Sequence, residues 1–212
     1  MQGLQPSLHI VTDNHYFAGG AAAWCEHDGL SLPVRVRTTL LSQGDEDLVG
    51  RRLSAPHALR ELTLLSVSDI RLRRQILWRL GRQGASVLVM APPGLFIPGQ
   101  AWLNSHDVAA MPDNVTVGLF WSAVRRRLAR GQAAPWGRES SGREVIYGLG
   151  DGESVAALSR RLGCPEKAVY STKARIMKRA GLTGVHGLIL CRDLVEYREL
   201  YLAQARRGAV AA

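Results

Sequence analysis

The sequence predicts two unlike halves: a doubly wound α/β half built on a parallel sheet, and an all-α half. Apolar runs such as SLHIVTD (7–13) and SVLVMAPPG (86–94) alternate with helix-like segments in the first half. This alternation is typical of parallel strands that are covered on both faces. The rest of the chain consists of helix-like segments separated by glycines. We expect an α/β domain over 1–131, a linker over 132–141 and a helical domain over 142–212.

The α/β half should begin with a strand at SLHIVTD, because this apolar run ends in the turn-forming pair Asp13 and Asn14. A helix-like segment follows over 16–27, and then the strand-like runs VRVRTTLL (34–41) and LTLLSVSD (62–69). Two further segments have the apolar spacing of amphipathic helices. They are 71–84, with Leu72, Ile76, Leu77 and Leu80 inward, and 117–131, with Leu119, Val124 and Leu128 inward.

The all-α half is divided by helix start and stop signals. Glycine commonly ends a helix, serine is a good N-cap, and proline is tolerated at the first helical position. These signals predict four helices, at 142–152, at 154–162 with Ser154 as N-cap, at 166–180, and from Gly184 onward. Gly163 makes the turn between the second and third helices, and Pro165 takes the first position of the third.

Basic charge is concentrated in the all-α half. The whole chain has a formal net charge of +9, and residues 160–179 carry seven basic side chains against the single acid Glu166. A basic surface attracts a polyanion, because each neutralised phosphate releases condensed counterions. The short helix, glycine turn and longer helix have the dimensions of a helix-turn-helix, whose second helix enters the major groove of double-stranded DNA.

The second helix of this pair has one apolar side and one polar side. Val169, Ile176 and Ala180 fall on the inward side with Leu158 and Leu162 of the preceding helix. The polar side chains can bond to base edges and pair with phosphates. The candidate DNA-binding residues are Lys167, Tyr170, Ser171, Lys173, Ala174, Arg175 and Lys178, with Arg160 and Arg161 of the preceding helix on the phosphate backbone.

The segment REVIYGLGDGESVAALSRRLGCPEKAVYSTKARIMKRAGL (143–182) resembles the four-helix DNA-binding domain of LuxR/NarL-type bacterial transcription regulators. The matching positions are Glu144-Val145-Ile146, Asp151-Gly152, Leu158-Ser159, Lys167-Ala168-Val169 and Ala180-Gly181-Leu182. The chain departs from the family at Gly142, where a glutamate is usual. The resemblance implies that Lys167, Tyr170, Ser171 and Ala174 face the groove, with Lys173, Arg175 and Lys178 near the groove or the backbone.

The first half resembles a response-regulator receiver domain over 8–131, which implies a flavodoxin-like sheet. IVTDNHYFAGGAAAWCE (10–26) is similar to the family's first strand and helix, and MPDNVTVGLFWSAVRRRLARG (111–131) to its last. Receivers are phosphorylated on an aspartate, with Mg²⁺ held by further acids and a lysine beside the phosphate. In this chain the corresponding positions form a degenerate pocket of Thr12, Asp13, Ser66 and Asp113. Residues 1–137 contain no lysine, so we expect a receiver that is not phosphorylated in the usual way.

Several partners are compatible with this reading. We expect a phosphorylation-independent dimer on double-stranded DNA, since two recognition helices reading two half-sites supply usable specificity. The receiver-like half is one candidate dimer surface, and the last helix, with Leu188, Ile189, Val195 and Leu200, is another. The dimer is either a homodimer or a heterodimer with another regulator, as in the capsule-synthesis co-regulators that this architecture resembles. An adaptor that acts through such a partner is the alternative. A third hypothesis is a nucleotide sensor of the cyclic di-GMP type, with Trp136 and Arg138 as candidate ligand residues.

Other function classes lack their sequence signatures. The six histidines are scattered and have no hydrolase or metal-site context, so we expect no enzyme activity, no metal and no cofactor. No apolar run approaches a membrane span, and the N-terminus has no secretory pattern. Cys25, Cys164 and Cys191 have neither metal-site spacing nor an even count, which favours reduced thiols and a cytoplasmic location.

Overall fold

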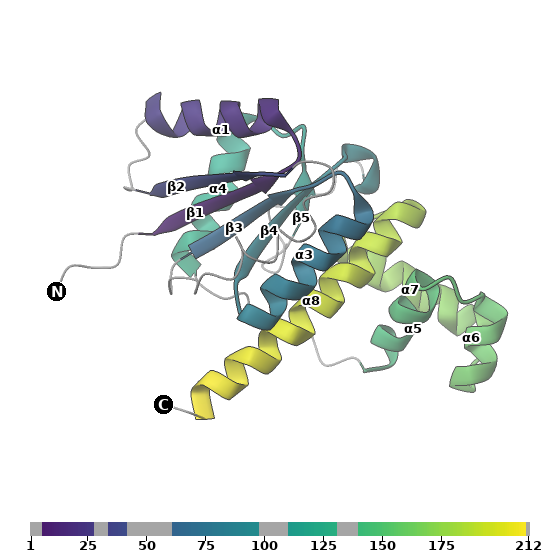
Figure 1. Ribbon diagram of the computed structural model, residues 1–212. Helices are drawn as coiled ribbons and strands as arrows, with labels where there is room; N and C mark the ends of the chain where they lie inside the picture. The colour runs from purple at the N-terminus through teal and green to yellow at the C-terminus, as the bar shows by residue number, and fades with distance from the viewer. Residues whose placement is uncertain (1–5, 28–33, 42–60, 98–109, 131–139, 211–212) are drawn as a thin grey trace.

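A five-stranded parallel sheet forms the centre of the first half (Figure 1). The computed structural model describes residues 6–27, 34–41, 61–97, 110–130 and 140–210. The strands are β1 (Ser7–Thr12), β2 (Arg35–Leu40), β3 (Glu61–Ser66), β4 (Ser86–Ala91) and β5 (Ala110–Pro112). Their order across the sheet is β2-β1-β3-β4-β5, with every pair parallel. This is the order of a doubly wound, flavodoxin-like sheet, so the predicted fold class is confirmed.

Helices cover both faces of the sheet, because successive strand residues point to opposite sides. On one face, Ile10 and Leu64 pack with the helices α1 and α4 in one apolar cluster. On the other face, the neighbouring residues Val11 and Leu65 pack with α3 in a second cluster. The helices of this half are α1 (His15–His27), α3 (Ile70–Gln83) and α4 (Val117–Arg130), with a short 3₁₀ turn η1 (Pro93–Leu95).

The second half is helical throughout residues 140–210. Its helices are α5 (Ser140–Gly150), α6 (Val155–Leu162), α7 (Glu166–Ala180) and α8 (Gly184–Val210). Helix α5 begins inside the stretch predicted as the linker (132–141), and residues 132–139 of that stretch lie outside the described residues. The linker and the domain boundaries therefore stay predictions. Among the helices of the described ranges, none has the combination of length and apolar character needed to cross a bilayer.

Helix α4 turns two of its three predicted inward residues to the core. Val124 is fully buried and Leu128 packs against the apolar cluster, as expected, but the side chain of Leu119 is 41% exposed. Phe120 and Trp121 are buried as well, and their rings meet edge to face with centroids 4.9 Å apart. Phe17 of α1 meets Phe120 in a second edge-to-face contact at 6.4 Å. Because aromatic rings bury the largest apolar area, their packing sets the rotation of the helix and turns Leu119 outward.

The longest helix of the second half, α8, lies beside α3 of the first half (Figure 1). Gly81 makes this approach possible, since a Cβ at that position would lie 2.6 Å from the carbonyl oxygen of Tyr197. The Tyr197 hydroxyl donates a 2.6 Å hydrogen bond to the carbonyl oxygen of Ala85. Leu190 and Leu194 of α8 join the apolar cluster on the α3 side of the sheet. The two halves therefore share one hydrophobic core.

We predict that Gly81→Ala separates α8 from α3 and destabilises the fold. The added methyl group would lie 2.6 Å from the carbonyl oxygen of Tyr197 and 3.0 Å from Cβ of Leu200. Neither atom can rotate away. The free energy of unfolding measured in urea should fall by about 1–3 kcal/mol, the usual cost of overpacking.

Gly19→Ala in α1 is the matched control. A Cβ at position 19 meets nothing within 4 Å, so the helix should gain about 0.5–1 kcal/mol from the alanine. Equal effects of the two substitutions would contradict a close contact at Gly81.

Candidate nucleic-acid interface

Helices α6 and α7 form a helix-turn-helix whose ends are defined by local hydrogen bonds. The Ser154 hydroxyl accepts the N–H of Ala157 at 3.1 Å, which makes Ser154 the predicted N-cap of α6. Gly163 ends α6 in the left-handed conformation with φ 63°, as the turn requires. Pro165 lies one position earlier than predicted: its ψ of 146° is extended, so it is the N-cap, and α7 begins at Glu166.

The inward side of α7 contains the predicted residues and adds Met177. Val169 is fully buried against Leu158 of α6, as expected. Ile176 and Ala180 are partly buried and pack against the core cluster, also as expected, and the unbranched Met177 is buried in that cluster with residues of α8. A Cβ at Gly142 of α5 would lie 2.8 Å from Cδ1 of Ile176, so a glutamate at this position would require that side chain to move.

The outward side of α7 brings most of the predicted DNA-binding side chains together. They share one side of the helix, because their spacing follows the helical period. Tyr170 is 56% exposed, and Lys173, on the flank, is partly buried. The exposed members are Lys167, Tyr170, Ser171, Ala174, Arg175 and Lys178. This side combines cationic groups, a phenol and a hydroxyl around the small Ala174, a shape and chemistry that suit a base-lined groove.

The two arginines at the end of α6 differ in their surroundings. Both are exposed, but Arg161 forms a two-pronged pair with Glu153, with Nη2–Oε2 and Nε–Oε1 distances of 2.8 and 3.2 Å. The hydrogen bond from Arg161 holds the pKa of Glu153 below its ordinary value. Helical spacing could not reveal this pair, because Glu153 precedes the N-cap. Arg160 pairs with no carboxylate of the described residues and is the more available of the two for a phosphate.

Backbone hydrogen bonds attach the far end of α7 to the α/β half. The N–H of Ile97 donates to the carbonyl oxygen of Gly181 at 2.9 Å, and the N–H of Thr183 donates to that of Leu95 at 2.8 Å. Phe96 and Leu182 thereby form an antiparallel bridge between the turn after α7 and the segment after β4. The end of the candidate recognition helix is therefore held against the edge of the sheet domain.

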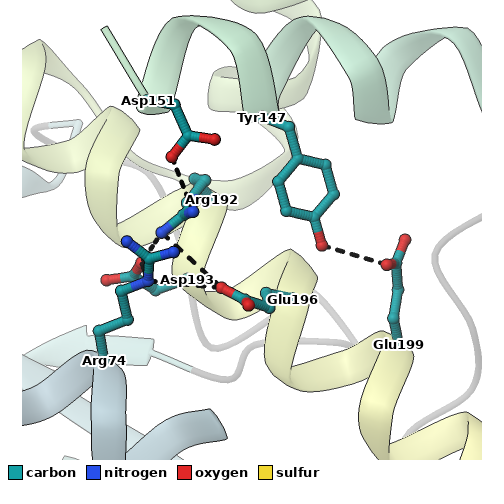
Figure 2. A network of polar contacts seen from close by, with 7 residues as sticks. All are labelled: Arg74, Tyr147, Asp151, Arg192, Asp193, Glu196 and Glu199. Carbon is teal, nitrogen blue, oxygen red and sulfur yellow. Dashed lines mark hydrogen bonds and ion pairs between the residues drawn. The ribbon is translucent and has the colours of Figure 1, made fainter.

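A network of charged side chains supports this arrangement from the side of α8 (Figure 2). Arg192 pairs with Asp151, in the turn between α5 and α6, at 2.7 Å and with its neighbour Asp193 at 3.3 Å. Arg74 of α3 lies 3.8 Å from Asp193 and 3.5 Å from Glu196. The side chains of Arg192 and Asp193 are 7% and 0% exposed. The network thus joins α3, α8 and the helix-turn-helix, with Arg192 and Asp193 buried at its centre and Arg74 and Asp151 exposed at its periphery.

Burial dominates the protonation of this network. Desolvation raises the pKa of Asp193 from 3.8 to about 6, although the arginines around it act in the opposite direction. Burial also lowers the pKa of Arg73, with the carboxylates of Asp193, Asp69 and Asp13 acting in the opposite direction. Arg73 therefore lies in the electrostatic field of two regions, α8 and the carboxyl edge of the sheet.

The residues of the predicted degenerate pocket lie at that carboxyl edge. Thr12 is buried, and its hydroxyl accepts the N–H of Asn14 at 3.0 Å. One oxygen of Asp13 accepts the N–H of Ser68 at 2.8 Å, so this carboxylate ties the end of β1 to the loop after β3. Ser66 is the neighbour of Thr12 in the strand register and is partly exposed. Asp113 is exposed, and its N–H donates to the carbonyl oxygen of Ala91.

Two further predictions concern ligands. Trp136 and Arg138, the candidate nucleotide-binding residues, lie outside the described residues. Within the described part of the chain, histidine, cysteine and carboxylate side chains do not gather in groups of three or more that could hold a metal ion. Asp69 is the N-cap of α3 and accepts the N–H of Leu72 at 2.9 Å.

Comparison with known proteins gives distant likenesses only. No family model and no curated protein matches the chain. Among solved structures, RcsB from Salmonella enterica serovar Typhimurium, bound to a promoter with a phosphomimetic, is 15% identical with a TM-score of 0.47 and 91% and 100% of the two chains covered. The response regulator StyR is 17% identical with a TM-score of 0.37 and 91% and 99% covered. The response regulator ChrA of a heme-sensing two-component system is 11% identical with a TM-score of 0.35 and 92% and 100% covered. These likenesses are too distant to assign a function.

We predict that the stability of the protein falls as Asp193 ionises. The folded pKa of about 6 exceeds the ordinary 3.8, so the folded protein binds this proton more tightly than the unfolded chain does. The resulting stability is present below about pH 4 and is lost as the pH rises through about 6. Asp193→Asn cannot ionise. As the pH rises from about 4 to above 6, the free energy of unfolding of this variant should therefore increase relative to that of the wild type, by on the order of 2 kcal/mol.

Urea unfolding of both proteins at each pH measures this difference. Parallel pH profiles for the two proteins would contradict the raised pKa.

Proposed function

We propose that the chain is a DNA-binding transcription regulator with α7 as its recognition helix. The observation that carries the proposal is the outward side of α7, where exposed cationic and hydrogen-bonding side chains surround Ala174. Lys167, Tyr170, Ser171 and Ala174 would face the groove. The side chains assigned to the phosphate backbone or the groove edge are Lys173, Arg175, Lys178 and Arg160, with Arg161 contributing once it leaves Glu153.

The way in which α7 is held supports this assignment. A helix that enters a groove must keep a defined position, because each base contact depends on its alignment. Val169 is buried against Leu158 on the inner side, and the bridge between Phe96 and Leu182 holds the carboxyl end. The exposed cationic side also argues against an adaptor that never touches DNA, because such an adaptor has no use for exposed cations at this spacing.

A dimer is part of the proposal, and the α/β half is the surface that we favour for it. The sequence offered Leu188, Ile189, Val195 and Leu200 of α8 as another dimer surface. In the structure Leu188 and Val195 pack in the core under α3, and Leu200 lies 3.0 Å from the position of a Cβ at Gly81. These side chains are engaged within the chain, so we assign the dimer contact to the α/β half of a second copy or of another regulator.

Phosphorylation independence is also part of the proposal. Two carboxylates at the carboxyl edge of the sheet have structural tasks, since Asp13 accepts the N–H of Ser68 and Asp69 caps α3. The position expected for the nucleophile is taken by Ser66, and residues 1–137 contain no lysine. We propose that the regulator acts in the cytoplasm, without a phosphoryl group as its signal.

We predict that Ala174→Glu abolishes site-specific DNA binding and leaves folding intact. Position 174 is exposed, so a larger side chain meets no protein atoms, but a carboxylate at the centre of the helix face would repel the phosphates. Fluorescence anisotropy with selected genomic duplexes over a salt series measures the effect. The wild type should show an affinity that falls roughly a thousandfold between 50 and 200 mM salt, as expected for about six phosphate contacts.

Ala23→Glu is the matched control, because position 23 is also exposed and helical but lies on α1. It should bind like the wild type. If Ala174→Glu bound equally well, α7 would not be the recognition helix.

We predict that acetyl phosphate with Mg²⁺ neither labels the chain nor changes its DNA affinity. The reason is the missing nucleophile and lysine at the sheet edge. Ser66→Ala should likewise bind as the wild type does in the anisotropy assay. Stoichiometric incorporation of labelled phosphate, seen by intact-mass spectrometry, would contradict this prediction.

A further inference from the structure

The charged side chains of helix α3 are all positive. Its sequence, IRLRRQILWRLGRQ, contains five arginines and no acidic residue. Arg73 is buried, and Arg74 pairs with Asp193 and Glu196 of α8. Of the others, Arg71 and Arg82 are exposed and Arg79 is partly exposed, and Trp78 beside them is exposed. We call this surface the α3 arginine face and define it as Arg71, Trp78, Arg79 and Arg82.

The α3 arginine face is a single surface whose positive charges are not paired with carboxylates of the described residues. Positions 71, 78 and 82 align on one side of the helix by their spacing, and 79 lies beside them. Among the described residues, no carboxylate lies within ion-pair distance of Arg71, Arg79 or Arg82. Trp78 is 40% exposed, and the guanidinium of Arg82 stacks over its ring at 4.7 Å from the centroid. The indole thus orients one arginine while the others remain free to bind an anion.

Arg71 is placed where a cation does not favour the helix. It lies in the first turn of α3, beside the positive end of the helix dipole, and this turn contains no acidic residue. A basic side chain there disfavours the helix. Arg82, by contrast, lies in the last turn, where a cation stabilises the helix. Helix stability therefore accounts for Arg82 but not for Arg71, and an external anion would offset the cost at Arg71.

The face continues toward the end of α8. Gly84, which ends α3, lies so close to Gln204 that a Cβ there would be 3.2 Å from Cγ of that residue. Arg206 and Arg207 follow on α8 and are exposed. The carboxyl end of α3 and these two exposed arginines of α8 are therefore neighbours in the fold. From Arg71 to Arg82 the helix rises about 16 Å, which spans several phosphates of a duplex.

We propose that the α3 arginine face is a second nucleic-acid surface, which binds the phosphodiester backbone of duplex DNA flanking the site read by α7. The proposal rests on the proposed function. A guanidinium group forms two parallel hydrogen bonds to phosphate oxygens. A row of arginines therefore suits a row of phosphates better than it suits a single carboxylate. Once α7 is bound, the flanking duplex is held near the protein at high effective concentration, so weak phosphate contacts become significant. A second copy of this chain, with its net charge of +9, is a poor occupant for such a face.

The double variant Arg71→Gln/Arg79→Gln tests the proposal in the full-length chain. Anisotropy salt titrations would use one duplex of about 15 base pairs and one of about 40 base pairs centred on the same site. On the longer duplex, the slope of log affinity against log salt should become shallower by about 2, with roughly tenfold weaker binding at low salt. Base preference, set by α7, should not change. Thermal unfolding should show no loss of stability, because the variant removes a cation from the first turn of α3.

Arg35→Gln/Arg125→Gln is the matched control, since it removes the same charge from exposed positions on β2 and α4. The control should lower the slope by much less than the α3 variant does. An unchanged slope for Arg71→Gln/Arg79→Gln on the longer duplex would overturn the proposal, and so would an equal loss in the control. The proposal would also be overturned if the α3 variant lost binding to a protein partner while its salt slope on duplex DNA stayed unchanged. If the wild type itself shows no salt-dependent duplex binding, the proposed function fails as a whole, which is a separate outcome.

Discussion

The contact between α8 and α3 is the constraint on which the arrangement of the whole chain depends. One end of α8 belongs to the helix-turn-helix half, and its length runs beside the sheet domain. At Gly81 the two helices meet without a side chain between them, and Tyr197 satisfies the carbonyl oxygen of Ala85 from across the interface. Sliding α8 along α3 would leave a buried carbonyl unpaired and open the packed core. The position of α7 relative to the sheet is therefore set by this pair of helices.

The charged network has a different role from the apolar contact. Removing Arg192 and Asp193 from water is costly, and their mutual attraction offsets that cost only in a particular geometry. Such groups add little net stability but penalise every alternative register, because a displaced α8 would leave a buried charge alone. We infer that the apolar core supplies the attraction between the halves, and that the pairs of Arg192 with Asp151 and of Arg74 with Asp193 select one docked arrangement.

Much of this architecture is predictable from the sequence, because local signals determine it. The apolar runs gave the strands, Ser154 and Gly163 gave the limits of α6, and helical spacing gave the outward side of α7. Contacts between distant segments were not predictable. Leu119 and Phe120 are adjacent and both apolar, so their sequence does not tell which of them is buried. Contact with the ring of Phe17, which belongs to another helix, favours burial of Phe120. Likewise, the spacing in α8 revealed apolar residues but not that they pack against α3. The sequence was therefore equally compatible with these residues forming a dimer surface.

The carboxyl edge of the sheet bears on the proposal that the chain acts without a phosphoryl group. The carboxylate of Asp13 ties the end of β1 to the loop after β3, and that of Asp69 begins α3, so both acids serve the static fold. Arg73 lies in the electrostatic field of these acids and of Asp193, which makes the edge and the α8 interface electrostatic neighbours. Because Asp13 and Asp69 are engaged in these contacts, we propose that the edge has no second state for a phosphoryl group to select. For the proposed dimer, association remains adjustable, because its occupancy of DNA would depend on protomer concentration. We infer that the amount of this protein, or of a regulator that pairs with it, is the input.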